Sequence, residues 1–291
     1  MSEATDKKIL ELLSRIDSLL PPSSGSTDWK CPAFRWRRHR YLGMEAGVLE
    51  PITRVAFVRS ENICNVDRQK NILLANTEQF VKGLPANNVL LTGARGTGKS
   101  SLIRAALTKF FDQGLRLIEV DKEDLTDLGE IATLVGDRPE RFIIFCDDLS
   151  FEMGEGSYKA LKAVLDGSVA ASSENMLVYS TSNRRHLMPE TMNDNLSSTH
   201  SDAGDLHPAE SVEEKMSLSE RFGLWLSFYP FSQEEYLNSA SQCSTYFGAP
   251  AGTETWRVEA LQFAMQRGSR SGRVAYQFAR DWAGRKGLGR V

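Results

Sequence analysis

One octapeptide dominates the interpretation of this sequence: Gly93-Ala94-Arg95-Gly96-Thr97-Gly98-Lys99-Ser100. It matches the pattern G-x-x-x-x-G-K-[ST] of a phosphate-binding loop, and it follows an apolar run and opens an amphipathic segment. Glycines let the backbone wrap around a phosphate with its N–H groups pointing inward, and a helix N-terminus adds partial positive charge. The octapeptide and Ser101 are therefore the expected phosphate-binding residues. A glycine-rich turn before a helix is the simpler alternative.

Two side chains of this loop and two following acids have more specific expected roles. The ammonium of Lys99 should reach the β- and γ-phosphates, and the hydroxyl of Ser100 should complete the coordination shell of Mg²⁺. The apolar run Arg141–Cys146 is followed by Asp147 and Asp148, and a parallel sheet brings such acids beside the loop. We expect Asp147 to hold Mg²⁺, directly or through water, and Asp148 to orient and deprotonate an attacking water. Alternatively, both acids only cap the turn that follows the strand.

Apolar runs and helical patterns alternate through the middle of the chain. Strands are expected at about 87–93, 115–120, 141–146, 176–180 and 224–228, and helices at about 67–82, 98–111, 122–135 and 156–167. This alternation indicates a parallel sheet built from right-handed crossovers. The predicted fold class is α/β, with a three-layer, parallel-sheet P-loop core at 61–230. An all-helical subdomain follows at 231–291, with helices near 232–240, 253–267 and 271–286.

The amino-acid composition of the chain is that of an ordinary globular protein. The chain has 291 residues, of which 41% are hydrophobic and 25% charged, and its net charge is −3. It has no apolar run long enough to span a membrane and no secretory pattern, so we expect a cytoplasmic protein without membrane contact. The four cysteines form no C-x-x-C pair, so neither a zinc site nor a disulfide framework is expected. Residues 1–60 are expected to be a helical and linker region, with an amphipathic helix at 4–20 and a strand-like run at Val55–Val58.

Five segments carry a resemblance to a known family. They are VDRQKNILLANTEQFVKGLPANNVLLTGARGTGKSSL, FCDDLSFE, STSNRRHL, EKMSLSERFGLWL and SGRVAYQFARDW. With them the chain resembles an AAA+ P-loop ATPase over about residues 54–283, and it is most similar to the bacterial predicted-ATPase family called domain of unknown function 815. The resemblance implies ATP and Mg²⁺ as cofactors, ATP hydrolysis, an ATP-dependent homo-oligomer and a C-terminal subdomain that acts as a lid.

The resemblance also implies roles for single residues. Asp67 and Gln69 lie in the segment that contacts adenine in AAA+ proteins, and Asn183 matches sensor 1, which positions the attacking water. Arg221 matches the arginine finger, which reaches into the site of a neighbouring subunit. Arg273 matches sensor 2, which touches the γ-phosphate in its own subunit. The simpler alternatives are a turn residue for Asn183 and ordinary surface charges for the two arginines.

The sequence departs from the family pattern at one catalytic position. Most AAA+ proteins have glutamate where this chain has Asp148, and aspartate is shorter by about 1.5 Å. Either the backbone lies closer to the water, or the water is positioned less well and turnover is slow. Glu152 is a possible substitute for Asp148, and Arg184 and Arg185 are rival candidates for the arginine finger.

The sequence does not identify the partner on which such a protein acts. The segment Trp29–Tyr41 mixes aromatic residues with arginines, a pattern suited to nucleic acid, and the C-terminus is a second basic segment. Alternatively, the tryptophans of Trp29–Tyr41 pack on the core while its arginines pair with acids. The polar stretch 189–215, with His200 and His207, is a candidate for partner contact or a pore loop.

Three hypotheses for the function follow. The first is an ATPase that couples ATP binding and hydrolysis to the remodelling or loading of a protein or nucleoprotein partner. The second is a nucleotide-gated binding or assembly module with little turnover. The third is a small-molecule kinase, which is the least supported because the sequence contains no signature of an acceptor site.

Overall fold

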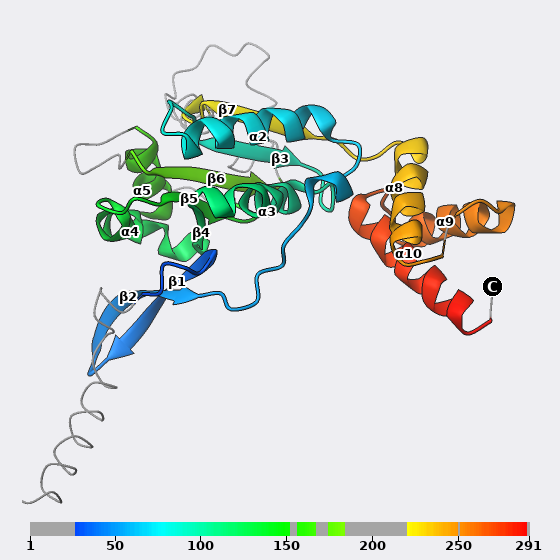
Figure 1. The fold of residues 1–291 in the computed structure, drawn as a ribbon, viewed down its shortest axis with the longest axis horizontal. Helices are drawn as coiled ribbons and strands as arrows, with labels where there is room; N and C mark the ends of the chain where they lie inside the picture. The colour runs from blue at the N-terminus through cyan, green and yellow to red at the C-terminus, as the bar shows by residue number, and fades with distance from the viewer. Residues whose placement is uncertain (1–26, 152–155, 167–173, 184–219, 250, 290–291) are drawn as a thin grey trace, which may run out of the picture.

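The computed structural model describes residues 27–151, 156–166, 174–183, 220–249 and 251–289. Within these residues, seven strands form one sheet in the order β2-β1-β4-β5-β6-β3-β7 (Figure 1). The strands β1 and β2 pair antiparallel, and every other pair of neighbours is parallel. The carboxyl ends of the parallel strands therefore meet along one edge of the sheet.

Five of these strands are those that the sequence predicts. They are β3 (Val89–Gly93), β4 (Leu115–Glu119), β5 (Arg141–Cys146), β6 (Met176–Ser182) and β7 (Leu224–Phe228). The strands β3 and β5 are almost entirely buried, because helices cover both faces of the sheet at these positions. The strand β6 lies between them, so the strand before the phosphate-binding loop and the strand before the acids are not direct neighbours.

Helices on both faces of the sheet give the three expected layers. They are α2 (Asp67–Val81), α3 (Lys99–Phe110), α4 (Leu128–Val135) and α5 (Gly156–Leu165), with short 3-10 turns η1 (Ser60–Asn62), η2 (Phe111–Gln113) and η3 (Lys122–Asp127). Alternate residues of β5 divide between two hydrophobic cores. Phe142 packs with α4 and α5, whereas Ile143 packs with α2 and α3. The structure confirms the α/β fold class, but the helix expected at 122–135 is divided into η3 and α4.

The region before residue 60 differs from the expectation of a helical or linker segment. Its strands β1 (Ala33–Tyr41) and β2 (Met44–Pro51) form a hairpin, and β1 joins the central sheet beside β4. Trp36 is fully buried, and Gly47 makes room for it, because a Cβ at Gly47 would lie 1.9 Å from the indole ring. The run Val55–Val58 is not a strand, and its two valines pack against the core instead.

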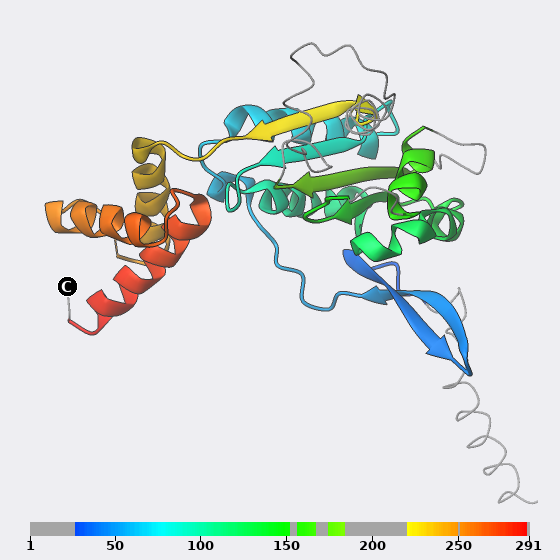
Figure 2. The same ribbon diagram turned by 180° about the vertical axis from the view of Figure 1, so that it is seen from behind.

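Among the described residues, three helices follow the last strand, as predicted, and the first of them extends beyond the expected 232–240. They are α8 (Gln233–Tyr246), α9 (Glu254–Gln266) and α10 (Gly272–Gly287). Their own hydrophobic core includes Tyr236, Trp256 and Phe278. A capping box of Ser232 and Glu235 begins α8. Figure 1 and Figure 2 show that these helices lie beyond the carboxyl ends of the parallel strands, which is the edge that carries the phosphate-binding loop.

Several predicted features lie outside the described residues. These are the helix at 4–20, Glu152, the rival fingers Arg184 and Arg185, and the stretch 189–215 with its two histidines. In the part of the chain that the structure describes, no helix has both the length and the apolar character needed to cross a bilayer.

Candidate functional site

The phosphate-binding loop connects the end of β3 to the start of α3. Gly93, Gly96 and Gly98 have φ angles of 127°, 76° and 99°, which residues with a side chain rarely adopt. Gly93 is also required sterically, because a Cβ there would lie 1.8 Å from the carbonyl oxygen of Phe228 on β7. Gly98 is the N-cap of α3, so the free N–H groups of the first helical turn face the loop. The result is a cradle for an anion.

Lys99 is the first residue of α3 and is only 6% exposed. Its ammonium donates hydrogen bonds to the carbonyl oxygens of Gly93 (2.7 Å) and Ala94 (2.8 Å) and to the side-chain oxygen of Asn183 (3.1 Å). Burial lowers the pKa of Lys99, and the nearby aspartates oppose this effect. A phosphate in the cradle would favour the charged ammonium further, so the lysine is suited to bind an anion.

Oxygen atoms from three elements meet beside Lys99. The hydroxyl of Ser100 donates a hydrogen bond of 2.7 Å to Oδ1 of Asp147, and the hydroxyl of Thr181 donates to the same oxygen. Thr181 belongs to β6, which lies between the strands that precede the other two residues. Hydroxyl and carboxylate oxygens are ligands that Mg²⁺ accepts, and the remaining ligands at nucleotide sites are phosphates and water. Ser100 and Asp147 therefore fit a magnesium ion bound together with a nucleotide.

Asp148 is held by a different set of contacts. Its φ angle of 55° lies in the left-handed region, and its N–H donates to the hydroxyl of Thr181 at 2.9 Å. Its carboxylate accepts a hydrogen bond from the amide of Asn183 and lies 3.8 Å from Arg95, yet the side chain is 57% exposed. Asn183 therefore bridges Lys99 and Asp148, while the carboxylate of Asp148 stays accessible to water.

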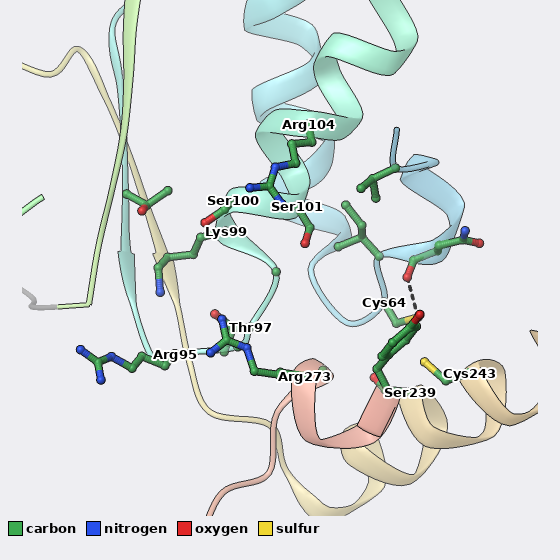
Figure 3. A pocket seen from close by; sticks show the side chains of 18 of the residues that line it. Cys64, Arg95, Thr97, Lys99, Ser100, Ser101, Arg104, Ser239, Cys243 and Arg273 are labelled. Carbon is green, nitrogen blue, oxygen red and sulfur yellow. Dashed lines mark hydrogen bonds between the residues drawn. The ribbon is translucent and has the colours of Figure 1, made fainter. Parts of the chain in front are cut away.

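These groups line one cavity of about 870 Å³ that also has a wall from the C-terminal helices (Figure 3). Arg273, at the start of α10, lines it and donates its backbone N–H to the carbonyl oxygen of Gly96 at 3.2 Å. A Cβ at Gly96 would lie 2.8 Å from the hydroxyl of Ser271, so the loop and α10 are in close contact. The predicted site residues that line the cavity are Arg95, Gly96, Thr97, Gly98, Lys99, Ser100, Ser101, Asp147, Asp148, Asn183 and Arg273.

The two residues expected to contact adenine are not among the described residues that line this cavity. Asp67 is paired with Lys70 at 2.7 Å, and the amide of Gln69 donates to the carbonyl oxygen of Ser227 at 2.9 Å. The stretch just before them contributes to the cavity wall instead, through Phe57, Val58, Asn62, Ile63 and Cys64.

Arg221 also lies apart from the cavity. It precedes β7, so it is at the amino ends of the parallel strands, whereas the phosphate-binding loop is at their carboxyl ends. Its guanidinium is paired with the carboxylate of Asp166, which follows α5. Within one chain, this arginine is therefore on the opposite edge of the sheet from the phosphate cradle.

One family model matches most of the chain. The model, described as a protein of unknown function (DUF815), matches residues 29–286. The chain belongs to this family. The match confirms the resemblance that the five sequence segments carry, and no match was found among curated proteins.

Solved structures with a similar fold have low sequence identity to this DUF815 chain. A variant of RuvB from Thermotoga maritima is 15% identical with a TM-score of 0.47, covering 77% of this chain and 61% of that chain. The Thermotoga maritima RuvB Holliday junction branch migration motor is 16% identical with a TM-score of 0.46, over 76% and 63% of the two chains. PCH-2 from C. elegans is 15% identical with a TM-score of 0.45, over 79% and 72%. The DUF815 chain thus spans less than two thirds of these RuvB chains.

Several lining residues of the DUF815 chain escaped the sequence analysis. Thr181 contacts both aspartates, and the only sequence signal for it is a position two residues before Asn183. Tyr246 on α8 and Tyr276 on α10 line the helical wall of the cavity. These tyrosines stand in ordinary helical patterns, so their sequence neighbours do not mark them as ligand contacts.

The basic segment Trp29–Tyr41 matches the interpretation in which its tryptophans pack on the core and its arginines pair with acids. Trp36 is buried, and its indole N–H donates to a carboxylate oxygen of Asp127 at 2.9 Å. Four arginines of the segment are paired with acids: Arg35 with Glu119, Arg37 with Asp121, Arg38 with Asp127, and Arg40 with Glu45. The observed contacts are therefore the packing and ion pairing that were the alternative to nucleic-acid binding.

If Ser100 and Asp147 hold Mg²⁺, Thr181→Val should weaken its binding to this DUF815 chain. Valine preserves the shape of the side chain but removes the hydroxyl that orients both aspartates. Loss of such a supporting hydrogen bond costs about 10- to 100-fold in metal affinity. Calorimetric titration of Mg²⁺ in the presence of ATP measures this loss.

Ser180→Ala is the matched control for this experiment. Ser180 is the preceding residue of β6, and its buried hydroxyl has no hydrogen-bond partner among the described residues. An equal loss of Mg²⁺ affinity in both variants would contradict the role assigned to Thr181.

Proposed function

We propose that this chain is a Mg²⁺-dependent AAA+ ATPase that couples ATP binding and hydrolysis to the remodelling or loading of a protein or nucleoprotein partner. The observation that carries the proposal is the 2.7 Å contact between Ser100 of the phosphate-binding loop and Asp147 at the end of β5. It brings the phosphate-binding loop and the carboxylate of Asp147 to one point, as a nucleoside triphosphate bound with its divalent ion would require.

The residues around the contact between Ser100 and Asp147 would have different chemical roles. Lys99 and the N–H groups of the loop would bind the phosphates, and Ser100 with Asp147 would hold Mg²⁺. When bound, the ion would neutralise charge that develops on the phosphate oxygens. The exposed carboxylate of Asp148 would accept a proton from the attacking water, and Asn183 would orient that carboxylate through its amide.

Lys99→Ala is the direct test of the phosphate site. The substitution removes the buried ammonium from the cradle, so ATP affinity should fall by at least about tenfold, in line with the loss of a charge-assisted hydrogen bond to phosphate. Equilibrium binding of a fluorescent ATP analogue measures the effect. Lys109→Ala, near the other end of α3, is the control and should bind normally. Undiminished affinity in the Lys99 variant would refute the nucleotide site.

A nucleotide-gated binding or assembly module with little turnover is the second candidate. One observation favours it: Asp148, which stands where most AAA+ proteins have the longer glutamate, is already engaged by Asn183 and lies near Arg95. A carboxylate held in these contacts is less free to turn toward an attacking water than one without them. In this case, ATP would bind and alter the helical wall of the cavity without efficient hydrolysis.

Asp148→Asn distinguishes the two candidates. If the chain is an ATPase, this variant should bind ATP within about twofold of the unchanged protein and lose about 100-fold or more in phosphate release, because a general base is removed. Asp112→Asn, an exposed position in η2, is the matched control. Negligible phosphate release already in the unchanged protein would favour the module, whereas near-normal release by the Asp148 variant would remove Asp148 from the mechanism.

Arg221 supports the proposal of an ATP-dependent homo-oligomer. It lies on the opposite edge of the sheet from the cradle of its own chain, so it could act as an arginine finger only in the site of a neighbouring copy. An arginine in that role stabilises the charge of the transition state and is worth about 10³- to 10⁵-fold in rate in related reactions.

Mixing two inactive variants tests this arrangement. Arg221→Ala and Lys99→Ala should each have little ATPase activity alone. In an equimolar mixture, the Lys99 variant would supply its intact Arg221 to the intact cradle of the other variant, so activity should reappear. Measurements of phosphate release against total protein concentration would follow assembly. No recovery on mixing would contradict the action of Arg221 between subunits.

A further inference from the structure

Asn65 has an unusual backbone conformation and lies between the sheet with its helices and the C-terminal helices. Its φ angle is 62°, a left-handed conformation that residues other than glycine seldom adopt and that asparagine tolerates best. It follows Cys64, which lines the cavity, and precedes Val66, the N-cap of α2. Backbone strain of this kind persists where surrounding contacts hold a residue firmly, and it recurs at clamps and switches.

The side chain of Asn65 makes three polar contacts, all of them with α8. Its amide nitrogen donates to the carbonyl oxygen of Glu235 and to the hydroxyl of Ser239, both at 2.8 Å. Its side-chain oxygen accepts from the amide of Asn238 at 3.3 Å. The donor and acceptor groups of one asparagine are thus both used on the same helix.

These contacts form one stripe along α8. Glu235, Asn238, Ser239 and Gln242 are spaced so that they share one face of a helix. The same face continues to the cavity, because the thiol of Cys64 donates to the side-chain oxygen of Gln242 at 2.7 Å, and both of these residues line the cavity. The stripe therefore fastens α8 to the segment that precedes α2.

The other end of the helical subdomain is fastened to the phosphate-binding loop. Tyr236 of α8 and Phe278 of α10 belong to one hydrophobic core, so these helices pack as one unit. The start of α10 contacts the loop through the hydrogen bond from Arg273 to Gly96. The helices are thus attached to the rest of the molecule at two places around the cavity, one at Asn65 and one at Gly96. Figure 3 shows Arg273 and Ser239 on the helical side of the cavity.

We propose that Asn65 is a positioning residue for nucleotide discrimination. By holding α8 on the core, it sets where α10 presents Arg273, and so how strongly this arginine favours ATP, which has a γ-phosphate, over ADP. The inference rests on the proposed nucleotide function, since it concerns the same site. Asn65 itself acts only through α8 and α10.

The experiment measures the dissociation constants of Mg·ATP and Mg·ADP and takes their ratio as the readout. Asn65→Gly keeps the left-handed backbone accessible and removes all three side-chain contacts. The preference for ATP over ADP should fall by about fivefold or more, the usual lower range for coupling between two sites. Asn65→Asp, which replaces the donating nitrogen with an oxygen that faces the carbonyl of Glu235, should show the same loss.

A double-mutant cycle separates positioning from a merely structural role. In the Arg273→Ala background, Asn65→Gly should cause no further change in the ATP-to-ADP ratio, because the residue that Asn65 positions is absent. Ser239→Ala, which removes one of the three contacts, should give a smaller change in the same direction. Ser241→Ala, on the same helix but outside the stripe, is the matched control and should leave the ratio unchanged.

Three outcomes would overturn the inference. They are an unchanged ratio in Asn65→Gly and Asn65→Asp, an equal effect of Asn65→Gly with and without Arg273, and an unchanged ratio in Arg273→Ala alone. If Asn65→Gly fails to fold, Ser239→Ala in the two backgrounds decides the same question. Failure of the proposed function is recognised separately, because then the unchanged protein would not bind ATP or Lys99→Ala would bind it equally well.

Discussion

The contact between the Ser100 hydroxyl and the Asp147 carboxylate depends on the order of strands in the sheet. Strand β6 separates β3 from β5, so the loop after one strand and the acid after the other could remain far apart. Thr181, at the end of β6, lies between them, and its hydroxyl donates a hydrogen bond to the carboxylate oxygen of Asp147 that Ser100 also contacts. The parallel direction of all three strands brings their carboxyl ends together, and everything proposed about nucleotide chemistry depends on that alignment.

The charged side chains that line the cavity suit an anion bound together with a divalent cation. Arg95, Lys99, Arg104 and Arg273 line the cavity together with two aspartates. Burial alone disfavours the charged form of Lys99, which is why its ammonium is held by carbonyl oxygens and by Asn183. Phosphate groups would satisfy the excess of positive charge, and a divalent ion would satisfy the carboxylates.

The helical subdomain completes the site rather than merely following it. The phosphate-binding loop needs glycine at position 96 partly because α10 approaches there, with Ser271 and Arg273 against the loop. On the other side of the cavity, α8 is bound to the segment before α2 through Cys64 and Asn65. A ligand between these attachments would touch both the sheet and the helices, so its binding and the placement of the helices would be linked.

The sequence by itself determined the five strands that carry the core, the helical end of the chain and the phosphate-binding loop with its two acids. These features are local, because a buried strand, an amphipathic helix and a glycine-rich turn each leave a pattern among neighbouring residues. Only the tertiary structure decided that β1 joins the sheet, that Thr181 supports both acids, and that residues 57–64 rather than Asp67 and Gln69 line the cavity. Each of these depends on contacts between residues distant in the chain. Arg35 and Arg37 of β1, for example, pair with acids 84 positions away, and no local period records such a pairing.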